Sequence, residues 1–161
     1  MFTPQDFLAD CRDEYFRLLL IYLISYSRQA CDWKKGTRIG FEGKELLSGF
    51  SPDWHHIFPQ KFLEENGVPD EKINALANMA VIDPRTNIRF GKKAPIHYLE
   101  KYEIPDEFLE QQLVPIDRKL LTVENYEKFL DARANLLANA ADRYFSEKRS
   151  RGTKVLVPST L

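Results

Sequence analysis

The sequence has few cysteines, no long apolar run and no recognisable export signal. Its two cysteines, Cys11 and Cys31, stand far apart and form no C-x-x-C pair, so neither a disulfide framework nor a cysteine-bound structural zinc is expected. The longest apolar run, 18–24, is far too short to cross a bilayer. The chain does not open with a charged segment, an apolar core and a small-residue cleavage site. We therefore expect a protein of the reducing cytoplasm.

The chain also lacks the excess of positive charge that a free-standing, high-affinity DNA-binding protein carries. Its formal net charge is -1, which gives little general attraction to phosphates. The basic residues are nevertheless unevenly distributed. They gather in one stretch of the second half, at Arg85, Arg89, Lys92, Lys93 and Lys101.

Length and composition predict one domain, 1–161. With 43% hydrophobic and 12% aromatic residues, the chain can bury a substantial core. Helical spacing of apolar residues predicts an N-terminal helical flank at 3–30 and a C-terminal one at 122–148, with shorter helices at 95–102 and 106–113. Between the flanks, 54–58 and 78–82 are expected to be strands, and Asp83-Pro84 is expected to begin a further helix. The predicted fold class is α+β and mostly helical.

The feature most indicative of function is the pair His55-His56, followed by Asn78 and Asn87. Histidine is the side chain best suited to take a proton from water at neutral pH. A neighbouring ligand and a carboxamide oxygen from a following helix would hold a metal ion beside that base. Such an ion stabilises the charge that develops during phosphodiester cleavage.

Three blocks of the sequence together resemble the HNH (ββα-metal, His-Me finger) nucleases. They are His55-His56-Ile57-Phe58-Pro59-Gln60, then 74–82 with Asn78, then Asn87 through Lys92-Lys93-Ala94-Pro95 to Tyr98-Leu99. Within that family the chain looks most like the C-terminal nuclease domain of GmrSD-type restriction proteins, which act against modified phage DNA. The resemblance implies a ββα-metal hairpin-helix module with core motif 54–99 and a metal-dependent DNA endonuclease activity that serves antiviral defence.

The resemblance also assigns roles to residues. His56 matches the general base, and Asn78 the middle asparagine, which mainly braces the loop that holds the base. His55 and Asn87 match the two metal ligands. Mg²⁺ is the ion that the family implies, but an imidazole in place of the usual aspartate favours Mn²⁺ or Ni²⁺. The N-terminal nucleotide-using recognition domain typical of GmrSD proteins has no counterpart in this chain, so a partner domain or subunit is expected.

Two other interpretations remain open. The chain could be a non-catalytic nucleic-acid-binding or partner-docking module with the same fold, or a toxin nuclease paired with an acidic immunity protein. Arg89, Lys92 and Lys93 are candidate phosphate contacts, although such residues are more often a solvated surface. The third histidine, His97, is expected to pack on a helix.

Overall fold

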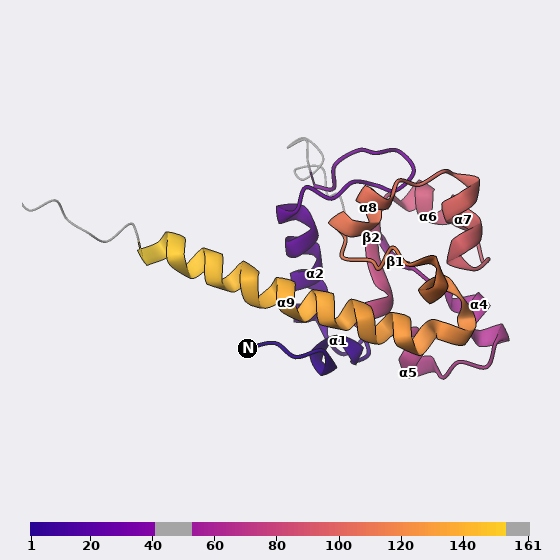
Figure 1. Cartoon of the computed structure of the whole chain (residues 1–161), viewed down its shortest axis with the longest axis horizontal. Coiled ribbons are helices and arrows are strands. Elements are labelled where there is room, and N and C mark those ends of the chain that lie inside the picture. The colour runs from indigo at the N-terminus through magenta and orange to yellow at the C-terminus, as the bar shows by residue number, and fades with distance from the viewer. Residues whose placement is uncertain (41–52, 154–161) are drawn as a thin grey trace, which may run out of the picture.

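A computed structural model describes residues 1–40 and 53–153, and it places a two-stranded antiparallel hairpin among helices (Figure 1). The rest of the predicted domain 1–161 lies outside the described residues. The α+β, mostly helical class is confirmed. In chain order the elements are α1 (Gln5–Leu8), α2 (Tyr15–Ser27), β1 (Asp53–His56), α4 (Gln60–Glu65), α5 (Asp70–Ile73), η1 (Leu76–Asn78), β2 (Met79–Ile82), α6 (Pro84–Phe90), α7 (Pro95–Lys101), α8 (Asp106–Gln111), η2 (Arg118–Leu121), η3 (Val123–Asn125) and α9 (Tyr126–Thr153).

The strands and the following helix form close to where the sequence predicts them. In the register of the hairpin, His55 lies opposite Ala80 and His56 opposite Met79. β1 begins one residue earlier than predicted and ends at His56. The carboxylate of Asp83 accepts a hydrogen bond of 2.8 Å from the backbone N–H of Arg85, so Asp83 caps α6 and Pro84 occupies its first turn.

The prediction of one continuous helix across the N-terminal flank is wrong. The chain leaves α1 after Leu8 and resumes helix only at Tyr15. In between, the backbone N–H of Cys11 donates to the carbonyl of Asn74 at 2.8 Å, and that of Leu76 donates to the carbonyl of Ala9 at 2.9 Å. These tertiary hydrogen bonds replace the helical ones, so apolar periodicity alone could not reveal the break.

Burial is uneven along α2. Ile21 and Ile24 are buried, whereas Tyr15 is 78% and Phe16 61% exposed. None of the helices in 1–40 and 53–153 has the length and apolar character needed to span a membrane.

The long helix α9 crosses one side of the domain and closes the core over the hairpin and the adjacent turn (Figure 1). The ring centroid of its Phe129 lies 4.9 Å from that of Phe58, the second residue after the end of β1. On the free edge of β2, the side chain of Gln112 both accepts from the N–H and donates to the C=O of Val81, at 2.8 and 2.6 Å. This carboxamide therefore takes the place of a third strand.

A buried arginine joins α9 to the hairpin. Arg133 is fully buried, and its guanidinium donates to the carbonyls of Ala77 at 2.8 Å, Met79 at 2.7 Å and Gln112 at 3.2 Å. Burial lowers the pKa of Arg133 to about 9, so the side chain is still a cation at neutral pH. A single side chain thus holds η1, the first residue of β2 and the residue that follows α8.

Replacing Arg133 with methionine should lower the free energy of unfolding by about 3 kcal/mol, because buried carbonyls lose charged donors. The matched control is Arg118→Met, which removes a half-exposed ion pair with Asp106 and should cost less than about 1 kcal/mol. Urea denaturation of both variants measures the difference. Equal stabilities would show that Arg133 does not tie the hairpin to α9.

Candidate active site

The two adjacent histidines point to opposite faces of β1. Successive side chains of a strand alternate in direction, so His55 faces the interior, where it is 2% exposed, while His56 is only partly buried. The pair therefore consists of two residues with different surroundings.

His55 lies in an aromatic pocket. Its ring centroid is 5.7 Å from that of Trp33 and 5.5 Å from those of Phe90 and Tyr98. Burial among these rings lowers the pKa of His55 to about 4, because water no longer solvates the imidazolium. The ring is neutral at pH 7, which is the state in which histidine binds a metal ion.

Asn87 on α6 links His55 to Asp53. Its Nδ2 donates to Oδ2 of Asp53 at 2.8 Å, which leaves its Oδ1 facing Nδ1 of His55, also at 2.8 Å. A carboxamide oxygen only accepts hydrogen bonds. Either a proton on Nδ1 or a cation must therefore lie between these two atoms.

Tyr98 completes the surroundings of His55. Its hydroxyl donates to the carbonyl of Ile57 at 2.7 Å, and its oxygen lies 3.4 Å from Nε2 of His55. That oxygen can accept a hydrogen bond from Nε2–H when Nδ1 is deprotonated. Metal-binding histidines are commonly oriented by such a partner on the second nitrogen.

The donor atoms around Asn87 suit a hard or intermediate divalent ion. Neighbouring ligands on an octahedral ion with bonds of about 2.1 Å are about 3 Å apart, close to the 2.8 Å between His55 Nδ1 and Asn87 Oδ1. Within the described part of the chain, no group of three or more His, Cys, Asp or Glu side chains is arranged to hold a metal ion. Any ion here would depend on the predicted pair His55 and Asn87, with Asp53 beside them.

His56 has a different partner on the other face of the strand. Its Nε2 lies 3.0 Å from Oδ1 of Asn74. Burial lowers the pKa of His56, and the hydrogen bond to Asn74 opposes that shift in part. Nδ1 of His56 has no partner among the described residues, yet it is not a buried atom, so water can reach it.

His55, His56 and Asn87 line one cleft of about 310 Å³. Trp54, Pro59, Gln60, Lys61, Glu64, Gly91 and Lys92 complete its lining. Of the three predicted phosphate contacts, Lys92 lies in this cleft, whereas Arg89 and Lys93 are exposed and are not part of its lining. His97 is exposed on α7 and lies outside the cleft. Lys61 and Glu64 were not predicted from the sequence.

Asn78 lies beneath the cleft, fully buried, and braces the turn after β1. Its Oδ1 accepts from the backbone N–H of Phe58 at 2.9 Å, and its Nδ2 donates to the carbonyls of Phe58 at 3.1 Å and Ile73 at 2.9 Å. The side chain touches neither histidine by hydrogen bond. Its contribution to the site is to hold together the start and the end of the segment that connects β1 to β2.

Comparison with known proteins adds one partial match. Residues amounting to 42% of the chain are 38% identical, over 67 residues, to the uncharacterized protein MJ0686 of Methanocaldococcus jannaschii. The chain spans only 12% of the length of that relative. No family model and no solved structure matches the chain.

Asn78→Ala should lower the free energy of unfolding by about 2 kcal/mol, because buried backbone groups lose their partners. Asn78→Asp should be at least as destabilising, since a carboxylate would face two carbonyls. The control is Asn135→Ala, which removes an exposed side chain that donates to its own helix. Thermal melts that do not distinguish the three variants would contradict the bracing role of Asn78.

Proposed function

We propose that this chain is a metal-dependent DNA endonuclease domain of the HNH, ββα-metal type. The observation that carries the proposal is the arrangement around one cleft: a neutral His55 beside Asn87 at 2.8 Å, and a His56 whose Nδ1 is open to water. These are the two requirements for hydrolysis of a phosphodiester, a binding position for a divalent cation and a base for the attacking water.

In the proposed reaction, His56 takes a proton from a water molecule whose oxygen bonds to phosphorus, the bond from phosphorus to the 3′ oxygen breaks, and the 3′ oxygen takes a proton from solvent. The ends that result carry a 5′ phosphate and a 3′ hydroxyl. His55 and Asn87 would hold a divalent ion, which when bound stabilises negative charge on the phosphate and on the leaving oxygen. Lys61 and Lys92, which both line the cleft, would contact the phosphate backbone.

The chain would act as the effector half of a modification-dependent restriction protein. Its net charge of -1 supplies little affinity for DNA by itself. A nucleotide-using recognition domain or subunit would supply target binding, as the resemblance to GmrSD-type proteins implies. The much greater length of the archaeal relative is compatible with such an arrangement.

A plasmid-nicking assay with Mg²⁺, Mn²⁺ or Ni²⁺, and with chelator, tests the proposal. His56→Ala should lower the rate by about 10²–10⁴-fold and leave Mn²⁺ binding measured by calorimetry almost unchanged, because its ring lies on the opposite face from Asn87. His55→Ala and Asn87→Ala should each weaken Mn²⁺ binding by more than about tenfold.

His97→Ala is the matched control and should match the wild type in both measurements, since its side chain is exposed and lies outside the cleft. Full cleavage by His56→Ala would remove the proposed base. Specific DNA binding with neither cleavage nor metal binding would instead identify a non-catalytic module.

The positions of the two adjacent lysines lead to a separate prediction. Lys92→Ala should weaken DNA binding and reduce the slope of log affinity against log salt by about 1, as expected for one lost phosphate contact. Lys93→Ala, the matched control, should change the slope less, because Lys93 is not part of the cleft. Fluorescence anisotropy over a salt series measures both, and equal effects would show that the cleft does not contact DNA.

A further inference from the structure

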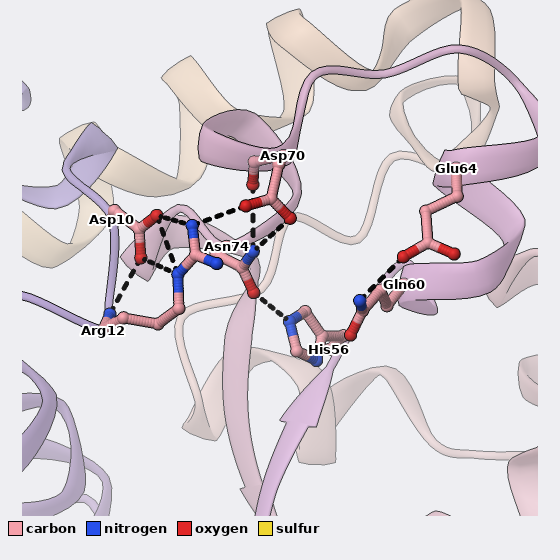
Figure 2. Close-up of polar contacts among 7 residues, drawn as sticks. All are labelled: Asp10, Arg12, His56, Gln60, Glu64, Asp70 and Asn74. Atoms are coloured by element: carbon pink, nitrogen blue, oxygen red, sulfur yellow. Dashed lines mark hydrogen bonds and ion pairs between the residues drawn. The ribbon is translucent and has the colours of Figure 1, made fainter.

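We propose that Asn74 is a positioning residue for His56, which fixes the tautomer of its imidazole so that Nδ1 is the bare nitrogen. The inference rests on the proposed function only in giving His56 the part of the base. Figure 2 shows the contacts: Asn74 stands between His56 and Asp70, and Arg12 joins Asp70 to Asp10.

The orientation of the Asn74 carboxamide follows from its neighbours. Its Nδ2 donates to the backbone carbonyl of Asp70 at 3.0 Å and to the carboxylate of Asp70 at 3.1 Å. Rotating the carboxamide by half a turn would place its oxygen against these two acceptors, which is unfavourable. Oδ1 of Asn74 must therefore face His56.

The orientation of Asn74 determines where the proton of His56 lies. An oxygen that only accepts hydrogen bonds, at 3.0 Å from Nε2, requires a proton on Nε2. In a neutral imidazole the lone pair is then on Nδ1, the atom that water can reach. A base whose lone pair already lies on the nitrogen that water reaches needs no tautomer change before it takes a proton.

Asn74 is itself held by a second segment of the chain. Its carbonyl accepts from Cys11, and Asp10 pairs with Ala75 in an isolated antiparallel bridge. The break between α1 and α2 thus brings the chain against the residue that contacts His56. The side chains of Arg12 and Asp70 are 56% and 59% exposed, so their ion pair should contribute little to the orientation of His56. Asn74 should contribute most to it.

The test compares Asn74→Ala with Asn74→Asp in the full chain. Both variants lose the hydrogen bonds that Nδ2 of Asn74 donates to Asp70 in α5. Only aspartate keeps an acceptor that faces His56. Long-range ¹H–¹⁵N correlation spectra of the three histidines, recorded above pH 7 without metal, report which imidazole nitrogen carries the proton. Asn66→Ala, which removes an exposed carboxamide that donates to Phe62, is the matched control.

In the wild type, in Asn66→Ala and in Asn74→Asp, we expect a proton on Nε2 of His56 that exchanges slowly with water. Asn74→Ala should lose this slow exchange and cleave DNA at least about tenfold more slowly, part of the 10²–10⁴-fold that a general base supplies. Asn74→Asp should recover much of that rate despite equal or lower thermal stability, which a purely structural role would not produce.

A wild-type His56 with the proton on Nδ1 would overturn the inference. So would a slowly exchanging Nε2 proton in Asn74→Ala. Because the spectra need neither metal nor DNA, they decide the tautomer even if the wild type fails to cleave, a result that would overturn the proposed function alone.

Discussion

The pleat of β1 is the constraint on which the candidate site depends. Since neighbouring side chains of a strand point to opposite faces, two successive histidines lie in two different environments. His55 enters the aromatic pocket and meets Asn87, while His56 meets Asn74 at the surface of the same hairpin. A shift of one residue in the register would exchange these environments and remove both sets of contacts.

The hairpin is too short to keep that register by its own hydrogen bonds. Buried polar side chains make the further hydrogen bonds that hold it. Asn78 ties the turn after β1 to the end of α5, Gln112 occupies the free edge of β2, and Arg133 holds one carbonyl in η1 and one at the start of β2. Each of these groups is surrounded by apolar core, where a lost hydrogen bond is costly. The core thus specifies one geometry for the strand that carries the histidines.

Many of the helices and strands could be predicted from the sequence, because short local patterns indicate them. Asp83-Pro84 marks the start of α6, a short apolar run marks β2, and periodic apolar residues mark α9. The break after α1 and the contacts of Asn74 and Tyr98 with the histidines could not be found in this way, because they are made only in the folded chain. Asp53 is an exception: it precedes His55 by two residues, so the period of a strand places both on one face. The sequence also marks Arg133 as unusual, because it is a charged residue within the apolar stripe of α9.

Anomalous scattering from crystals of the chain soaked in Mn²⁺ would show whether one face of β1 binds a metal ion while the other carries the base. We expect a manganese peak bound by Nδ1 of His55 and Oδ1 of Asn87, with His56 unligated and still hydrogen-bonded through Nε2 to Asn74. A peak bound by His56, or a strong peak elsewhere with none near Asn87, would contradict it.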